Sequence, residues 1–482
     1  MSKRFFANLG FLLQISGLLT ALPIAVGLYL NETQAVISLF ITCVTFLGFG
    51  FLLNALCERK DLDFKGSNFL FLATFIVLPL IGSIPYWYLN SFGSSNILDN
   101  FTNGYFESIS GFTTTGFSFV ANAEILPKSL LIYRSLTELI GGVGIVFLIL
   151  AFFQSRKSLN NLSNSVGMQD VCGSLKKTYF SVFAIYGTYI LGFTGIFYAL
   201  GFTNLINTGT FVVDTITGGF QPNAATYTQF LALAPKICII LLMLLGSLNF
   251  AFSYHLFTRK LKEALSPEII LYFIIMIVGT VAISLASPVN IFDSLFHVVS
   301  MSSSTGQSFI PLTSFGDTGY SILIVLMLIG GCTFSMAGGI RISRIISFAK
   351  SAKQSLMGIL VKEQAISMPK KNGDENESLE NLSASVSITL FVVALIVLSI
   401  IFTTIGVSFT DAIFEVGSAL TTNGISMGIT TLTMPVGYKW LMIAAMTIGR
   451  VEILSIFLAL FTLRKKNREP LHFSISLFDR KK

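Results

Sequence analysis

The 482-residue sequence contains few charged residues. Asp, Glu, Lys and Arg make up 11% of the chain, whereas hydrophobic residues make up 53%. Soluble globular proteins carry about 25% charged residues, so this composition excludes a soluble multidomain protein. Runs of about 20 apolar residues, long enough to cross a bilayer as helices, recur along the chain, and the mean hydropathy is +0.76. The sequence therefore predicts a polytopic membrane protein.

Side chains for metal or acid–base chemistry are also scarce. The histidines are His255, His297 and His472. Because they are widely scattered, they form no cluster of the kind that a membrane enzyme needs. The cysteines are Cys43, Cys57, Cys172, Cys238 and Cys332, and their positions predict no disulfide framework. No nucleotide-binding motif is present. We expect neither an enzyme nor a nucleotide bound by this chain.

A short phrase that ends in glycine recurs along the chain. In its three clear copies, a Phe lies ten residues before a Gly that follows hydroxyl or amide residues. These pairs are Phe106–Gly116, Phe296–Gly306 and Phe414–Gly424. A weaker copy, Thr217-Gly218-Gly219-Phe220, keeps the Gly-Phe ending of the first. Internal repeats decide the architecture of a chain, and these copies predict one element built four times around an axis.

The apolar runs predict about ten membrane spans. They cover residues 9–30, 35–57, 68–89, 129–153, 178–200, 233–256, 268–287, 319–340, 385–406 and 438–463. The first two spans stand outside the repeat, and each later pair encloses one copy of the phrase. The predicted fold class is an all-α membrane protein. Four pseudo-symmetric helix–pore loop–helix repeats surround a central pore, and two N-terminal transmembrane helices are added.

This fold predicts a division of the chain into seven parts. They are a two-helix extension (1–60), pore repeat 1 (61–155), pore repeat 2 (156–260), pore repeat 3 (261–350), a cytoplasmic linker (351–384), pore repeat 4 (385–465) and a basic cytoplasmic tail (466–482).

Lys and Arg residues in short loops predict the orientation of the spans. Most of the 31 Lys and Arg residues lie in clusters on one side of the predicted spans. Both termini are therefore expected in the cytoplasm and the Gly phrases on the outer side. The net charge of +7 is then positive-inside bias and not a nucleic-acid surface. We expect no nucleic-acid partner, and the basic tail is expected to contact anionic lipid headgroups or a partner.

The segment before each Gly is too short to cross the bilayer. Asp293 and Asp411 lie 13 residues before their glycines and predict helix N-caps, and Asn103 has the same offset. A helix that enters from outside and stops at mid-membrane directs its partially negative C-terminal end to the centre, where it stabilises cations. The following residues favour exposed carbonyls, and rings of carbonyls can replace the hydration shell of a cation.

The residues predicted to bind the cation belong to the four copies. They are Thr114, Thr115, Gly116, Thr217, Gly218, Gly219, Ser304, Thr305, Gly306, Thr422, Asn423 and Gly424. The alternative is that Gly and Thr occur here only at helix ends and packing contacts, as in many membrane helices. Four copies with flanking helices favour the first interpretation.

Residues 330–339 interrupt the eighth span with four glycines and several polar side chains. The residues of interest are Gly330, Gly331, Cys332, Thr333, Ser335, Gly338 and Gly339. The run predicts a broken helix with a loop beneath the carbonyl rings, and the alternative is a tightly packed small-residue helix. Arg450 lies midway along the last span, where a central Arg costs about 2.5–3.5 kcal/mol on insertion scales. It is expected either to face the pore and hold this loop or to cap carbonyls of a neighbouring helix.

Several charged residues are expected to support the rings without touching ions. Glu107, His297 and Glu415 recur at one offset in the short helices and are predicted to brace the loops from behind. The second copy has Thr210 at that offset, so its register is the least defined. Arg134 and Glu138 lie one helical turn apart and are predicted to pair with each other.

The four Gly-containing phrases between paired spans, together with the two extra N-terminal spans, resemble the Trk/Ktr/HKT superfamily of potassium transporters. The resemblance covers nearly the whole chain. In plant HKT relatives, a Ser in place of the first filter Gly goes with sodium selectivity, whereas all four positions here are Gly. The resemblance implies potassium-selective, channel-like uptake across the bacterial inner membrane, with potassium as the transported ion.

The family also has an intramembrane gating loop, which would correspond to residues 330–339, and a pore-facing Gly-Arg-x-Glu in its last helix, which matches Gly449 to Glu452. A homodimer and a TrkA-like cytoplasmic nucleotide-binding regulatory subunit are implied as partners. The alternative function is a potassium symporter, coupled to sodium or protons through the same filter. Its candidate coupling residues are Glu138, Asp214 and Glu452.

Overall fold

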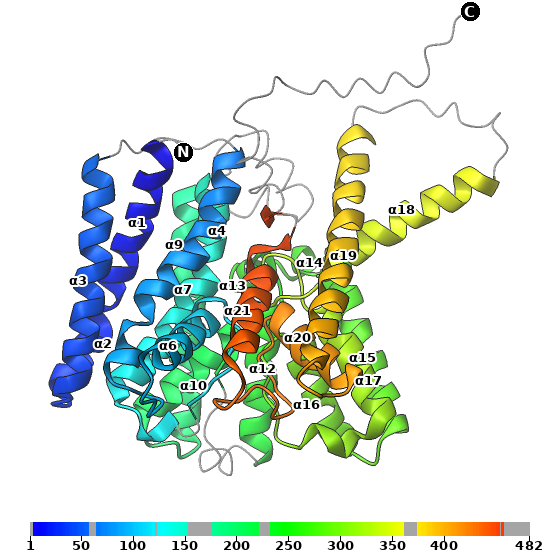
Figure 1. The fold of residues 1–482 in the computed structure, drawn as a ribbon. Helices are drawn as coiled ribbons and strands as arrows, with labels where there is room; N and C mark the ends of the chain where they lie inside the picture. The colour runs from blue at the N-terminus through cyan, green and yellow to red at the C-terminus, as the bar shows by residue number, and fades with distance from the viewer. Residues whose placement is uncertain are drawn as a thin grey trace, which may run out of the picture.

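The computed structural model describes residues 3–56, 64–120, 123–152, 175–220, 232–360, 374–453 and 455–456. Within these ranges the chain is built from helices, and no strand is present (Figure 1). The helices of the predicted spans are α1 (Lys3–Leu19), α2 (Ala21–Tyr29), α3 (Thr33–Leu56), α4 (Phe64–Gly82), α5 (Ile84–Tyr88), α7 (Lys128–Phe152), α9 (Leu175–Ala199), α12 (Leu233–Ser247), α13 (Phe250–Phe257), α15 (Pro267–Ala286), α17 (Gly316–Ile329), α19 (Asp374–Thr403) and α21 (Val436–Val451).

Seven helical stretches in the described ranges are long and apolar enough to cross a bilayer, or eight if the bent pair α12–α13 counts as one span. Helices α7 and α21 occupy the fourth and tenth predicted spans. Most side chains in the second half of α7, and the chain after residue 456, lie outside the described residues. The prediction of an all-α membrane protein is confirmed, while the count of ten remains a prediction.

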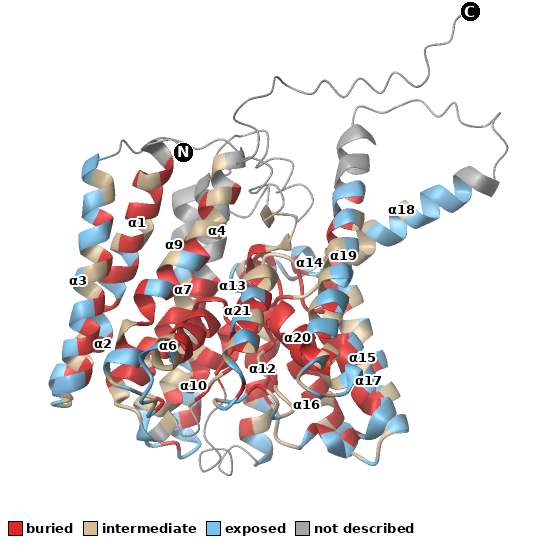
Figure 2. Ribbon diagram, viewed as in Figure 1, coloured by how far each residue is buried: buried red, intermediate tan, exposed pale blue. Residues whose placement is uncertain are grey.

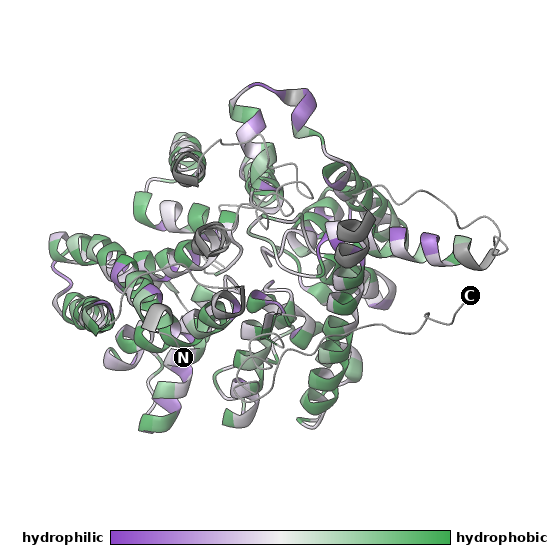
Figure 3. Ribbon diagram, turned by 90° about the horizontal axis from the view of Figure 1, so that it is seen from above, coloured by the Kyte–Doolittle hydropathy of each residue, from purple (hydrophilic) through white to green (hydrophobic). Residues whose placement is uncertain are grey.

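The surface of this bundle is apolar. Phe40, Val44 and Phe49 of α3 are each more than half exposed, and hydrophobic residues cover much of the helix surface seen from above (Figure 3). Such exposure is expected of helices that contact lipid, because lipid tails are as apolar as the side chains. Helix α18 (Ile342–Leu360) leaves the bundle and projects sideways (Figure 1).

Four short helices occupy the interior of the bundle. They are α6 (Ile97–Phe112), α10 (Leu205–Thr217), α16 (Ile291–Ser302) and α20 (Phe409–Leu420). Their C-terminal parts are almost entirely buried (Figure 2). A chain that places four helix C-termini in its core must satisfy their free carbonyl groups, so the loops that follow these helices are the centre of the fold.

Each short helix begins with a side-chain cap. Asn290 Oδ1 accepts a hydrogen bond from the Asp293 N–H at 2.8 Å, and Ser408 Oγ accepts one from the Asp411 N–H at 3.1 Å. The predicted N-caps Asp293 and Asp411 are therefore wrong by three residues. Their carboxylates accept hydrogen bonds from the side chains of the true caps, Asn290 Nδ2 and Ser408 Oγ, each at 2.7 Å. Asn103 lies in the second turn of α6, because that helix begins earlier, at Ile97.

Glycines in the following helices let the short helices approach closely. A Cβ at Gly141 would lie 1.9 Å from the Phe112 carbonyl oxygen. The corresponding distances are 2.2 Å from Gly246 to the Ile216 oxygen and 2.2 Å from Gly449 to the Leu420 oxygen. Each glycine thus packs on the C-terminal end of the short helix that precedes it. This contact explains the glycines that follow the first, second and fourth phrases by about 25 residues, whereas Gly331 of the third unit packs on Ala337 and Ser247 instead.

Polar side chains join each unit to the next near the start of the short helices. The cross-contacts are Lys128 Nζ to Asn207 Oδ1 (3.0 Å), Lys236 Nζ to Asp293 Oδ1 (2.9 Å), Tyr320 Oη to Asp411 Oδ1 (3.4 Å) and Lys439 Nζ to Asn103 Oδ1 (2.7 Å). They run from α7 to α10, α12 to α16, α17 to α20 and α21 to α6. The four units are therefore tied into a closed cycle.

Candidate functional site

The loops after the four short helices meet in a closed ring. A Cβ at Gly116 would lie 2.2 Å from the Gly219 carbonyl carbon, and one at Gly218 would lie 2.5 Å from the Ser304 oxygen. The third and fourth loops touch in the same way, because a Cβ at Gly306 would lie 2.0 Å from the Asn423 oxygen. The ring closes where a Cβ at Gly424 would lie 1.7 Å from the Thr115 oxygen.

We call these four segments ring loops 1 to 4, comprising residues 113–118, 218–220, 303–308 and 421–426. All twelve residues predicted to bind the cation lie in these loops or at their helix ends. Four of the glycines face the backbone of a neighbouring loop, so a side chain there would push two loops apart; they are Gly116, Gly218, Gly306 and Gly424. Glycine in this ring is required by close approach.

Ring loops 1, 3 and 4 leave their helices in the same way. In loop 1, the Thr115 N–H donates to the Ser110 oxygen at 2.8 Å and the Thr114 N–H donates to the Gly111 oxygen at 2.9 Å. This pair of bonds is a Schellman motif. The equivalent left-handed residues in loops 3 and 4 are Ser304 (φ 57°) and Thr422 (φ 52°), and Thr114 has φ 55°.

A left-handed Thr or Ser is strained, and glycine would be favoured at such a position by about 1 kcal/mol. The hydroxyl groups are retained nevertheless. Thr114 Oγ1 and Thr422 Oγ1 are buried and have no hydrogen-bond partner among the described residues.

Ring loop 2 differs from the other three. The filter-like glycines of loops 1, 3 and 4 follow their helices by four residues, whereas Gly219 follows the end of α10 by only two. Gly218, with φ 84°, is the C-cap of α10, and its N–H donates to the Asp214 oxygen. The second copy is thus shorter, which explains why its register is difficult to assign from the sequence.

The side chains predicted to brace the loops lie behind them. Glu107 accepts hydrogen bonds from Ser118 Oγ (2.8 Å) and the Phe119 N–H (3.0 Å). Glu415 accepts from Ser426 Oγ, the Met427 N–H and Thr430 Oγ1, each at 2.7 Å. His297 Nε2 lies 3.1 Å from Ser308 Oγ. In all three loops the brace reaches a serine eleven residues further along the chain.

Arg134 pairs with a different residue from the one predicted. Its guanidinium donates to Glu107 Oε1 at 2.7 Å and to Ser118 Oγ at 2.9 Å. Glu138 instead accepts bonds from Thr217 and Phe220 of the second unit. The prediction of an Arg134–Glu138 pair was wrong, because packing brings a buried carboxylate of α6 to Arg134, and this pair is stronger than one along a single helix.

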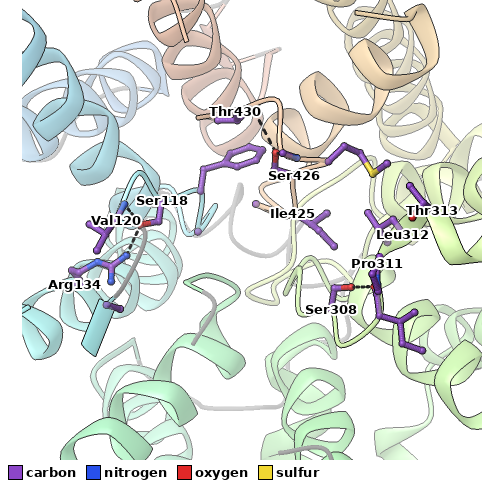
Figure 4. Close-up of a pocket in the computed structure, with 17 residues that line it drawn as sticks. Ser118, Val120, Arg134, Ser308, Pro311, Leu312, Thr313, Ile425, Ser426 and Thr430 are labelled. Atoms are coloured by element: carbon purple, nitrogen blue, oxygen red, sulfur yellow. Dashed lines mark hydrogen bonds between the residues drawn. The ribbon is translucent and has the colours of Figure 1, made fainter. Parts of the chain in front are cut away.

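A cavity of about 620 Å³ opens above the ring. Its lining combines loops 1, 3 and 4, including Ser118, Ser308 and Ser426 (Figure 4). Arg134 also reaches this cavity from α7. The cavity therefore borders three of the four ring loops.

Residues 330–341 lie directly beneath the ring. The predicted span 319–340 was too long, because α17 ends at Ile329 and α18 begins at Ile342. The Gly338 N–H donates to Ser304 Oγ at 3.1 Å, and a Cβ at Gly338 would lie 2.4 Å from the Thr421 oxygen. We call residues 330–341 the crossing loop, because they cover ring loops 3 and 4 from below.

The crossing loop pairs with a second break that sequence reasoning missed. Helices α12 and α13 form a pair bent by 112°, although the sequence predicted one span. The Cys332 N–H donates to the Ser247 oxygen (3.0 Å), and the Met336 N–H donates to the Gly246 oxygen (3.0 Å). The Phe250 N–H in turn donates to the Phe334 oxygen (3.1 Å). The backbone N–H and C=O groups that lose their helical partners at one break thus form hydrogen bonds with groups of the other break. Such pairing is needed because unpaired backbone groups are costly at membrane depth.

Further side chains hold the crossing loop in place. Glu268 Oε1 accepts a hydrogen bond from the Thr333 N–H at 2.7 Å, and the Thr333 hydroxyl bonds to Ser343. Arg450 donates to the Met336 oxygen at 3.1 Å and to the Gly141 oxygen at 2.9 Å. On the inner side, Glu452 pairs with Arg341 at 2.9 Å and also with Arg344.

The predicted gate residues are thus brought together by the fold. Cys332 is fully buried in the crossing loop, and Ser335 Oγ donates to the Cys332 oxygen at 2.6 Å. Gly330 has φ 73°, and a Cβ there would lie 2.1 Å from the Gly338 oxygen, so the two ends of the loop close on each other. The glycine-rich run from Gly330 to Gly339 predicted this loop, but Glu268 carried no sequence signal because it lies in the first turn of α15 as an ordinary acidic residue.

Comparisons with known proteins agree with this geometry. A family model described as TrkH, cation transport protein, matches residues 269–468. The chain is 29% identical to the uncharacterized cation transporter MJ1485 of Methanocaldococcus jannaschii over 94% of each chain. It is 27% identical to the Trk system potassium uptake protein TrkH of Halomonas elongata, over 96% of this chain and 99% of that protein. The Escherichia coli TrkH is 25% identical over 84% of this chain and 86% of its own length.

The fold is also that of a solved transporter. The crystal structure of the potassium transporter TrkH from Vibrio parahaemolyticus matches with a TM-score of 0.80 at 20% identity, covering 95% of this chain and 98% of the other. These relatives are ion transporters and not enzymes. The family model and the curated relatives thus make the chain similar to the TrkH proteins of the Trk/Ktr/HKT superfamily.

Proposed function

We propose that the protein is a potassium-selective, channel-like uptake protein whose filter is the ring of four loops. The observation that carries this proposal is the closed contact of the loops in the order 1, 2, 3, 4. Four helix C-termini approach the ring, and their partial negative charge favours a cation there. The names of the TrkH relatives, which are potassium uptake proteins, support potassium as the transported ion.

Oxygen atoms of the ring would replace the hydration shell of the ion. The Ser304 and Thr114 carbonyl oxygens both face Gly218, at 2.5 and 3.6 Å from its Cβ position. The unpartnered hydroxyl groups of Thr114 and Thr422 would add two further oxygen ligands for the ion. The described residues contain no group of three or more His, Cys, Asp or Glu able to hold a metal ion. Potassium would accordingly be selected by carbonyl and hydroxyl oxygens, as in other potassium filters.

The crossing loop is proposed as the gate of this pathway. It contacts loops 3 and 4 from below, and it is attached by backbone hydrogen bonds to the α12–α13 break and by side chains, of which Arg450 is buried and charged. Deleting Thr333 to Ala337 should raise potassium flux in the absence of any regulator, because the obstruction would be removed. Unchanged or lower flux in the folded deletion protein would contradict the proposed gate.

Cellular setting and partners follow from the family. We propose a bacterial inner-membrane location with both termini cytoplasmic, a homodimer, and regulation by a TrkA-like nucleotide-binding subunit on the inner face. The relatives named as Trk system proteins support this assignment. Helix α18 projects from the bundle on the side of the crossing loop (Figure 1) and is the described element best placed to contact such a subunit.

A symporter coupled to sodium or protons is the second candidate. One observation favours it: Asp214 is buried, and its Oδ1 has no hydrogen-bond partner among the described residues. Flux in liposomes with and without a sodium or proton gradient separates the two functions. Potassium accumulation against its own gradient at zero voltage would rule out the passive channel.

The proposed filter is tested by Gly116→Ser. A bacterium that lacks potassium uptake should grow at low potassium with the wild-type protein. Because a side chain at Gly116 would collide with Gly219, the variant should lose potassium-over-sodium selectivity by about tenfold or more, the scale of a buried polar group left unsatisfied. Unchanged selectivity in a folded variant would remove Gly116 from the filter.

A further inference from the structure

Among the residues that the structure describes, the second unit supplies no brace for ring loop 2. In the other loops, Glu107, His297 and Glu415 lie nine residues before the filter glycine and bond to the loop that follows. The residue at that offset in the second unit is Thr210. Its hydroxyl donates to the Asn207 oxygen of the same helix at 3.0 Å and therefore does not serve as a brace.

A carboxylate from a neighbouring helix occupies the missing position. Glu138 belongs to α7, in the first unit, and is fully buried. Its Oε1 accepts a hydrogen bond from the Phe220 N–H at 2.9 Å, and its Oε2 accepts one from Thr217 Oγ1 at 3.1 Å. These bonds resemble those of Glu107 and Glu415, which also accept a backbone N–H just beyond the filter glycine.

The reason for glycine at position 219 is also different. At Gly116, Gly306 and Gly424, an added Cβ would meet the backbone of the adjacent ring loop. At Gly219 it would lie 1.8 Å from Glu138 Oε1, and its three nearest atoms all belong to that carboxylate. Gly219 therefore makes room for the Glu138 side chain.

The same region connects loops 1 and 2. The Arg134 guanidinium carbon lies 3.9 Å from the centre of the Phe220 ring, and Arg134 also pairs with Glu107. The Arg134 guanidinium thus lies between Glu107, which braces loop 1, and Phe220, which Glu138 holds in loop 2.

We infer that Glu138 is the positioning residue of ring loop 2, supplied by the first unit, and that potassium selectivity depends on it. This inference rests on the proposed filter. Without the Glu138 carboxylate, the Phe220 N–H would be left without its partner in a buried site, and loop 2 would rotate to satisfy it. The Gly218 and Gly219 carbonyls would move with the loop, and the ring would no longer match one ion size.

The test compares Glu138→Ala, Glu138→Gln and Gly219→Ala in proteoliposomes, with the potassium-to-sodium flux ratio as the readout. We expect Glu138→Ala to lower the ratio about tenfold. Glu138→Gln should stay within about threefold of wild type, because its amide oxygen can still accept the Phe220 N–H. Gly219→Ala should lower the ratio like Glu138→Ala, since the new methyl group displaces the carboxylate.

A double variant tests whether the two residues act at one place. If Gly219→Ala works through Glu138, it should cause little further loss in the Glu138→Ala background, because coupled residues are non-additive. Independent losses that multiply would overturn the coupling. Where Glu138→Ala yields no folded protein, the contrast between Gly219→Ala and Glu138→Gln decides the same question.

Glu32→Gln is the matched control. Glu32 also ties down α7, since it accepts from the Lys128 and Ser129 N–H groups, but it lies far from the ring in the N-terminal extension. It should leave the flux ratio unchanged even if the melting temperature falls. If Gly116→Ser lowers the ratio while Glu138→Ala does not, the role of Glu138 is overturned and the filter stands. If neither variant alters it, the proposed filter itself is overturned.

Discussion

Arg450 Nη1 lies 3.1 Å from the Met336 carbonyl oxygen, so a charged side chain of the last helix holds the middle of the crossing loop. Arg450 is 5% exposed and has no acidic hydrogen-bond partner among the described residues; its nearby acid, Glu452, pairs with Arg341 and Arg344. Arg450 therefore caps carbonyl groups of the crossing loop and of α7, whereas its position facing the pore stays a prediction.

Replacing Arg450 by alanine should release the crossing loop. A hydrogen bond to a charged group contributes about 1.5–3 kcal/mol, which corresponds to a tenfold or greater increase in the open fraction. We expect basal rubidium or potassium flux from proteoliposomes to rise by about that factor. Arg450→Lys, which retains the charge and one bond, should give a smaller rise. Equal flux in all three proteins would show that this contact does not limit permeation.

Gly338→Ala should also disturb the gate, from the opposite side of the loop. The added methyl group would lie 2.4 Å from the Thr421 oxygen and 2.6 Å from Thr422 Oγ1. The crossing loop must then move away from loop 4, and basal flux should increase several-fold. Gly437→Ala is the control, because nothing lies within 4 Å of a Cβ there. A silent Gly338→Ala variant would argue against tight contact between loop and ring.

Removing the brace of loop 4 should weaken ion discrimination. Glu415→Ala would eliminate three hydrogen bonds of 2.7 Å to Ser426, Met427 and Thr430. We expect the potassium-to-sodium flux ratio to fall by about tenfold, because a buried N–H and two hydroxyls lose their acceptor. Glu263→Ala, which removes a half-exposed carboxylate, should have no effect on this ratio.

Lys439→Met should destabilise the closed cycle of units. The buried Lys439 ammonium donates to Asn103 Oδ1 and to the Leu432 oxygen, each at 2.7 Å. Methionine fills similar space but leaves both acceptors unpaired, which should cost about 2 kcal/mol. The melting temperature in detergent should drop, whereas the exposed Lys260→Met change should leave it unaltered. A Lys439→Met protein as stable as wild type would show that the tie from α21 to α6 is dispensable.

The sequence predicted ring loops 1, 3 and 4 well. Their helices all end four residues before the glycine, so an equal Phe-to-Gly spacing in the sequence gives the glycines equivalent positions after their helices. Loop 2 could not be predicted in the same way, since its helix ends two residues before Gly219. Its brace comes from a helix more than 70 residues earlier. Spacing within one repeat holds no information about a side chain that another repeat supplies.

Partners chosen by tertiary packing were likewise beyond local reasoning. Arg134 and Glu138 have the spacing of a helical pair, yet α6 presents the buried Glu107 to Arg134. The bend between α12 and α13 falls in an apolar stretch whose one local signal is Asn249, which caps α13 by accepting from the Phe252 N–H. That bend is stable because the crossing loop supplies its hydrogen bonds.

The paired breaks also constrain how the protein is made. Residues 246–250 leave the ribosome well before residues 330–341, so their free carbonyl and amide groups enter the membrane before their partners exist. Unsatisfied backbone groups in lipid are costly. The second unit therefore cannot reach its final shape alone, and insertion of the third completes both. A nascent chain that stops before the crossing loop should be recognised as unfinished by membrane quality control.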